Sequence, residues 1–75
     1  MTLDKGVPGM VLKVDSIGDS DLKERLMTMG LTPGIKVKVL RSAPLGDPMA
    51  IDLRSYNLAI RRKDAAHITV EEIEA

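Results

Sequence analysis

A helical period occurs in only one stretch of this chain, residues 19–34, DSDLKERLMTMGLTPG. Three apolar side chains recur at i, i+4 and i+7 and so share one narrow face of a helix: Leu22, Leu26 and Met29. Gly30 suits the left-handed residue that follows a helix C-terminus, and Leu31 would then reach back onto the helix. The Thr-Pro-Gly that comes next is typical of a type II turn. The stretch therefore predicts a helix over about residues 20–29, a glycine stop and a turn into a strand.

The rest of the chain alternates between apolar and polar residues in five short runs, which predicts five strands. The clearest run is residues 35–39, IKVKV, whose valines would face inward and whose lysines would face water. The other runs lie at residues 10–15, 49–54, 58–61 and 68–70. A single 3₁₀ turn is expected near residues 63–66, and an acidic tail at residues 71–75.

Short strands around one helix predict a mainly β, closed or nearly closed barrel with the helix at one end. An open sheet of such strands would leave its edges unpaired and one apolar face uncovered. Seventy-five residues suffice for one domain, residues 1–75, whose small core gives modest stability.

Composition limits the classes of function. The lack of cysteine excludes disulfides and thiolate metal sites. No apolar run approaches the roughly 18 residues of a membrane span, and the N-terminus has no apolar leader. We therefore expect a cytoplasmic protein that does not insert into the membrane.

Eleven basic and eleven acidic side chains balance each other, but the bases gather in residues 35–63. This segment holds seven Lys and Arg residues against Asp47 and Asp52. The one aromatic residue, Tyr56, is too little for the base stacking that single-stranded nucleic acid binding uses. The pattern favours a solvated sheet face, and we expect no nucleic acid as a partner.

No catalytic set stands out in the sequence. One histidine and no cysteine offer no nucleophile with a base and an orienting acid. The glycine-rich residues 30–34 lack the Lys-Ser/Thr of a phosphate loop. His67 and Asp64 could supply two metal ligands at most, whereas a metal site needs about three or four. We therefore expect no enzyme activity, no metal site, no cofactor and a surface position for His67.

Three motifs of the chain resemble the signatures of the FeoA family. They are GLTPG at residues 30–34 with the flanking Arg25-Leu26 and Val37-Lys38-Val39, APLGDP at residues 43–48, and LAIRRKDA at residues 58–65 with ITV at residues 68–70. Together they cover residues 3 to about 71. Ser55 stands where the family usually has a turn glycine, and Ile60 where leucine is usual. The resemblance implies a small SH3-like five-stranded barrel of the bacterial ferrous iron transport system.

The resemblance also implies an accessory role. FeoA proteins are understood as partners of a membrane ferrous iron transporter with a cytoplasmic GTPase domain, so we expect contact with that transporter at the inner face of the membrane. The alternative is a regulatory barrel similar to the C-terminal domain of metal-dependent transcription repressors, although these residues contain no helix-turn-helix. An RNA-binding barrel fits the charge balance and the aromatic content less well. Self-association is left open.

Apolar residues that the core does not need are the candidates for a docking surface. Met27 points away from the helical stripe, Leu31 follows the helix stop, and Leu45 lies at the tip of the Pro-rich loop. They would form a contact patch at the helix end, since interface energy concentrates in a few apolar anchors. Scattered exposure of single apolar residues is the competing interpretation. The next candidates for docking are three bases on one strand face: Lys36, Lys38 and Arg54.

Overall fold

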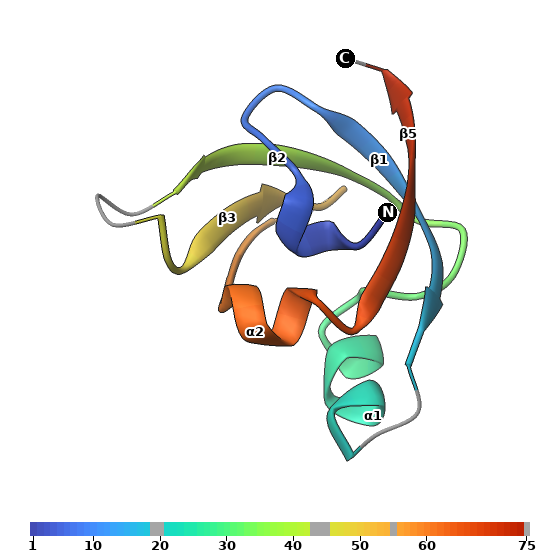
Figure 1. The fold of residues 1–75 in the computed structure, drawn as a ribbon. Coiled ribbons are helices and arrows are strands. Elements are labelled where there is room, and N and C mark those ends of the chain that lie inside the picture. The colour runs from blue at the N-terminus through green and yellow to red at the C-terminus, as the bar shows by residue number, and fades with distance from the viewer. Residues whose placement is uncertain (19–20, 43–45, 55, 75) are drawn as a thin grey trace.

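The structure is a computed structural model that describes residues 1–18, 21–42, 46–54 and 56–74. Five antiparallel strands form one curved sheet in the order β4-β3-β2-β1-β5 (Figure 1). The strands are β1 (Val11–Ile17), β2 (Lys36–Ser42), β3 (Met49–Asp52), β4 (Asn57–Ile60) and β5 (Ile68–Glu74). Helix α1 (Asp21–Thr28) connects β1 to β2, the single turn α2 (Arg62–Ala65) connects β4 to β5, and the 3₁₀ turn η1 (Leu3–Lys5) precedes β1. The predicted mainly β architecture with one inserted helix is confirmed.

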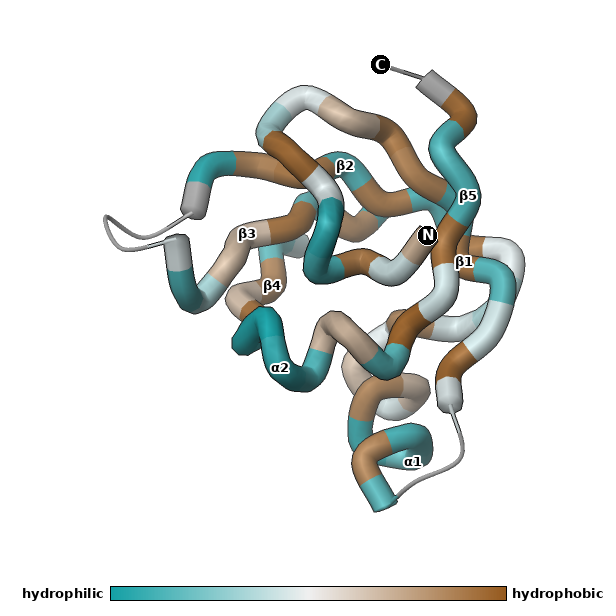
Figure 2. The backbone as a smooth tube through the Cα atoms, in the orientation of Figure 1, coloured by the Kyte–Doolittle hydropathy of each residue, from teal (hydrophilic) through white to brown (hydrophobic). Residues whose placement is uncertain are grey.

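Alternation along the strands decides which side chains form the core, and Figure 2 shows apolar positions on all five strands. Val37 and Val39 of β2 are each 1% exposed, whereas Lys36 and Lys38 face water. Helix α1 adds Leu26 to the same core. The other strands bury Leu12 and Val14 of β1, Met49 and Ile51 of β3, Ile60 of β4, and Ile68 and Val70 of β5. The inward faces predicted for these strands are confirmed, although Leu58 of β4 is only half-buried.

The C-terminus of α1 has the glycine stop that the sequence predicts. Gly30 has a φ of 102°, in the left-handed region. The Leu31 N–H donates to the Leu26 carbonyl at 3.0 Å, and the Gly30 N–H donates to the Met27 carbonyl at 3.0 Å. These are the two backbone bonds of a Schellman motif, which satisfy carbonyls that the helix would otherwise leave free.

Gly30→Ala should lower the free energy of unfolding by about 1–2 kcal/mol, since an L side chain is strained at positive φ. The added Cβ would also lie 3.4 Å from the Tyr56 hydroxyl. The matched control is Gly18→Ala, because Gly18 has no positive φ and its Cβ would lie at an ordinary 3.5 Å from the His67 carbonyl. Urea unfolding measures both variants. Equal stability would mean that the helix stop does not depend on glycine.

Two Pro-Gly turns hold the opposite ends of the ribbon formed by β1 and β2. Gly9 and Gly34 each follow a proline and have φ values of 97° and 93°. The Gly34 N–H donates to the Val14 carbonyl at 2.7 Å, and the Val14 N–H donates back to the Ile35 carbonyl at 2.9 Å. At the other end, the Gly9 N–H donates to the Val39 carbonyl at 2.9 Å. The Val39 N–H donates back to the Met10 carbonyl, also at 2.9 Å. Equivalent bonds therefore set the register of the ribbon from both ends.

Two segments differ from the predictions. Residues 71–74 belong to β5 rather than to a tail, and Glu71 lies opposite Lys13 of β1. The backbone bonds of the sheet outweigh the low strand propensity of glutamate, and an opposite charge across the ladder favours this pairing. The turn predicted near residues 63–66 begins one residue earlier as α2, and its backbone bonds reach back four residues as well as three. It is therefore α-helical, and the 3₁₀ turn seen in the described residues is η1 instead.

The open side of the barrel lies between the edge strands β4 and β5, which do not pair with each other. Arg62 of α2 connects the segments on this side. Its side chain donates to the carbonyls of Gly46 and Asp4, each at 2.5 Å, and its backbone N–H donates to the Asp47 carboxylate at 2.8 Å. These bonds join α2 to η1 and to residues 46–47 across sequence separations of 15 to 58 residues.

Candidate functional site

The structure separates the three residues that the sequence proposes for docking. Met27 is 37% exposed on α1, so its side chain can reach a partner. Leu31 is 0% exposed and lies in the same core cluster as Leu26. The Schellman motif turns the chain back at this point, which places Leu31 inside and corrects the expectation that its side chain forms part of the surface. Leu45 lies outside the described residues.

Tyr56 is a surface residue beside the helix end that the sequence reasoning missed. Its side chain is 46% exposed, and its carbonyl accepts a hydrogen bond from the Leu53 N–H at 2.9 Å. A Cβ placed on Gly30 would lie 3.4 Å from the Tyr56 hydroxyl and 3.9 Å from Leu53 Cδ1. The connection between β3 and β4 therefore brings the one tyrosine next to the end of α1. Tyr56 could have been singled out from the sequence because it is the only aromatic residue. The sequence does not show, however, that it lies next to the end of α1.

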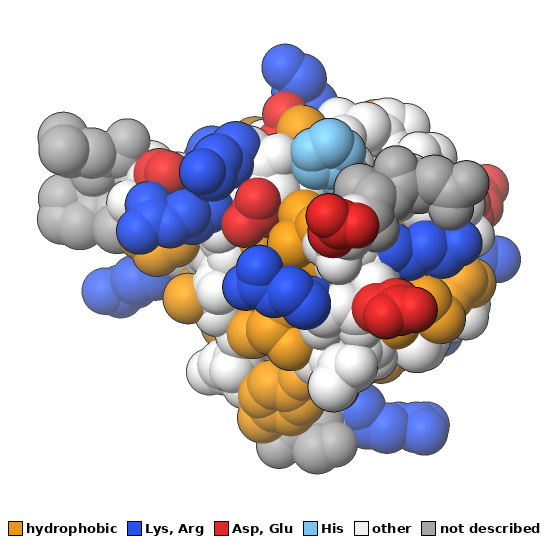
Figure 3. Space-filling model, turned by 90° about the horizontal axis from the view of Figure 1, so that it is seen from below, with side chains coloured by type: hydrophobic (Ala, Val, Ile, Leu, Met, Phe, Trp, Pro, Cys, Tyr) orange, Lys and Arg blue, Asp and Glu red, His pale blue; other side chains and the backbone are white. Residues whose placement is uncertain are grey.

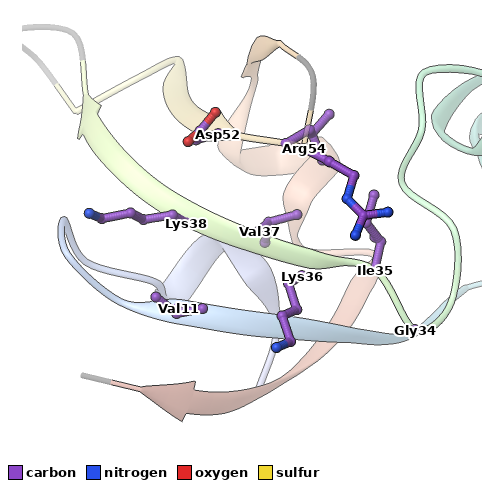
Figure 4. A pocket seen from close by; sticks show the side chains of 9 residues that line it. Val11, Gly34, Ile35, Lys36, Val37, Lys38, Asp52 and Arg54 are labelled. Carbon is purple, nitrogen blue, oxygen red and sulfur yellow. The ribbon is translucent and has the colours of Figure 1, made fainter.

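A hollow of about 550 Å³ lies on the outer face of β2, beside β1 and the end of β3 (Figure 4). We call it the basic groove, and its lining includes Lys36, Lys38, Arg54, Asp52, Ile35 and Val11. The structure thus brings together the three bases that the sequence names as the second docking candidate. In Figure 4 the Arg54 side chain extends from the end of β3 toward Ile35, at the same end of the groove as Gly34.

The basic groove carries unpaired positive charge. Lys36 and Lys38 share the outer face of β2 because they are two residues apart in a strand. Neither lysine nor Arg54 forms an ion pair with a carboxylate in the part of the chain that the structure describes. Three bases against the single acid Asp52 leave a net charge of +2 in the groove. Such a surface attracts anionic groups, and added salt should screen the attraction.

The basic groove and the end of α1 adjoin each other. Leu53 lines the groove and also lies beside Gly30. We call Met27 and Tyr56 the helix-end surface. Figure 3 shows the face that carries α1 and α2, where small groups of hydrophobic side chains lie between positively and negatively charged ones.

A metal centre is not evident in the described residues. His67 is exposed just after α2, as the sequence predicts. Within residues 1–18, 21–42, 46–54 and 56–74, no three His, Cys, Asp or Glu side chains gather where they could hold a metal ion. No described helix has the length and the apolar character needed to cross a membrane.

Comparison with known proteins identifies the family. The family model described as the FeoA domain matches residues 1–72 of this chain. The chain belongs to the FeoA family. A relative of this FeoA domain in Porphyromonas gingivalis is an Fe(2+) transport protein A/Fe(2+) transporter FeoB fusion protein, 34% identical over 73 residues. The match covers 97% of this chain but only 8% of the length of the fusion protein.

Solved structures show the same barrel. The FeoA protein from Chlorobium tepidum is 39% identical, with a TM-score of 0.90 over 99% of this FeoA domain and 71% of that chain. The FeoA of Stenotrophomonas maltophilia, solved with zinc and described as an SH3 domain protein, has a TM-score of 0.83 at 24% identity. That match covers 95% of this chain and 89% of the other, and at this identity it shows the fold alone. The family and the SH3-like barrel predicted from the sequence are confirmed.

Proposed function

We propose that this FeoA domain is an accessory of ferrous iron transport that acts by contact with a membrane transporter. One observation carries the proposal: the Porphyromonas gingivalis relative joins an FeoA part and the transporter FeoB in one polypeptide. Parts that are fused in one protein stay at one place in the cell, so a separate FeoA domain is expected to work at the same transporter. The contact would be made on the cytoplasmic side, where the FeoA resemblance places the GTPase domain of the partner.

The helix-end surface is the proposed point of contact. Met27 supports this assignment because it is exposed and lies outside the core cluster, and methionine adapts well to a partner surface. Tyr56 adds a second exposed side chain of the type that often anchors interfaces. Leu45 remains part of the proposal on sequence grounds. Leu31 contributes from the core, by holding the end of α1 in place.

Met27→Asp should weaken association with the transporter by about 1–3 kcal/mol, as the loss of an interface anchor does. Folding should be retained, because Met27 is exposed. The matched control is Val7→Asp, which places the same charge on a side chain that is 54% exposed in the first Pro-Gly turn, away from α1. Copurification of the transporter from solubilised membranes measures association, and growth on ferrous iron measures its consequence.

Equal association for the two variants and the parent would move the contact away from α1. Recovery of a DNA-binding repressor in place of a transporter would favour the regulatory barrel instead.

A further inference from the structure

We propose that the basic groove binds an extended acidic segment of a protein partner, with carboxylates at alternate positions. The inference deepens the proposed function by naming the chemistry of the partner segment, and it rests on that function only in assigning the segment to the transporter. The features that carry it are three bases with no ion-pair partner among the described residues, one acid, and a hollow of about 550 Å³.

The spacing of the bases fits an extended peptide. Lys36 and Lys38 lie on one face of β2, so their Cα atoms are about 7 Å apart. Alternate side chains of an extended peptide have the same spacing. A segment lying along β2 can therefore place carboxylates beside both lysines at once. A single small anion would have to draw the two side chains together against their mutual repulsion.

The rest of the groove suits the same ligand. Arg54 adds a planar guanidinium that can take a carboxylate through two parallel hydrogen bonds. Ile35 and Val11 are half-buried and give the floor of the groove an apolar character. The aliphatic parts of the acidic side chains can pack on these residues, while the side chains between them point away from the sheet. Specificity would thus come from alternation, with acidic side chains directed toward the bases and the intervening side chains directed toward solvent.

Charges around the groove limit the size of the anion. Lys36 lies opposite Lys13 of β1, and Lys13 lies opposite Glu71 of β5. Glu71 is therefore only two strand spacings, about 10 Å, from Lys36 across the sheet. Asp52 lies opposite Lys38 on the other side. A long polyanion or a charged membrane surface would meet both Glu71 and Asp52, whereas a short segment along β2 would meet Asp52 alone, against three bases.

The test uses a defined probe and the intact chain. A fluorescein-labelled peptide, Gly-Glu-Thr-Glu-Thr-Glu-Gly, is titrated with the protein and followed by fluorescence anisotropy. A second peptide with Gln in place of each Glu keeps the shape and removes the charge. We expect binding of the glutamate peptide alone, with an affinity that falls as salt is added.

Charge reversals locate the binding site. Lys36→Glu and Lys38→Glu should each weaken binding of the glutamate peptide by about fivefold, the scale of one exposed charge pair. The matched control, Lys63→Glu, makes the same change at an exposed lysine of α2 and should leave the affinity unchanged. Both groove lysines are exposed, so the variants should fold.

Several results would overturn the inference. They are equal binding of the glutamine peptide, an equal loss of affinity in Lys63→Glu, and tighter binding of a single-stranded oligonucleotide or of phosphatidylserine vesicles. Self-association of the parent that Lys36→Glu abolishes would identify a second copy as the occupant, and would also overturn it. The peptide measurement needs no transporter, so its outcome does not depend on whether the proposed function is correct. Met27→Asp should retain full peptide binding even if it weakens association with the transporter.

Discussion

Val37→Asp is expected to unfold this FeoA domain. Val37 is 1% exposed and lies opposite Leu12, which is 0% exposed, in the middle of the β1–β2 ribbon. No basic side chain belongs to the core cluster described around it, so the new carboxylate would be buried without a partner. Burying an unpaired charge costs several kcal/mol, about the whole stability of a domain of this size. The far-UV circular dichroism spectrum should show loss of the strands at room temperature.

The matched control for this variant is Lys36→Asp. It introduces the same side chain one position earlier in β2, at an exposed site opposite Lys13. This variant should keep a cooperative thermal transition, because its carboxylate remains in water. A cooperative melt of Val37→Asp near that of the parent would show that the inward face of β2 has been assigned to the wrong residues.

Leu31→Ala should lower the free energy of unfolding by about 2–5 kcal/mol, the range for truncating a buried leucine. Leu31 is 0% exposed, so the shorter side chain would leave a cavity behind the end of α1. Met27→Ala is the control, since it truncates a neighbouring apolar side chain that is 37% exposed. Its cost should stay below about 1 kcal/mol. Urea denaturation monitored by circular dichroism compares the two.

The same pair of variants separates a core role from a docking role. Parent-like stability of Leu31→Ala with a loss of transporter association would return Leu31 to the contact surface. A large loss of stability would explain weaker association without any contact between Leu31 and the partner.

Much of the fold follows from local patterns that the sequence shows directly. The alternation of residues 35–39 predicts which side chains of β2 are buried, because strand geometry alone sends neighbours to opposite faces. Gly30 and Gly34 mark the end of α1 and the start of β2, since both positions need a positive φ. These features depend on a few consecutive residues, so a single sequence is enough to find them.

The features that sequence reasoning missed depend on contacts between distant residues. Glu71 belongs to a strand because its backbone pairs with β1, opposite Lys13, and no local pattern reveals that pairing. The position of Tyr56 beside Gly30 likewise depends on how the β3–β4 connection packs against α1. Leu31 is a different case, because sequence reasoning assigned it two roles: a contact back onto the helix and a place in the docking surface. The Schellman motif and the buried side chain agree with the first role and contradict the second. The candidate site was therefore less predictable than the fold.

The paired Pro-Gly turns also affect how a ligand would bind on the outer face of β2. Because backbone bonds at Gly9 and Gly34 fasten both ends of the ribbon, the strand that carries Lys36 and Lys38 is ordered before any ligand arrives. Ordering a backbone residue costs about 1–2 kcal/mol of conformational entropy. In this domain that cost is already met by folding, so only the long side chains and the incoming segment lose freedom on binding. The β1–β2 ribbon is therefore preorganised, and the backbone positions of Lys36 and Lys38 keep a fixed separation whether or not a ligand is bound.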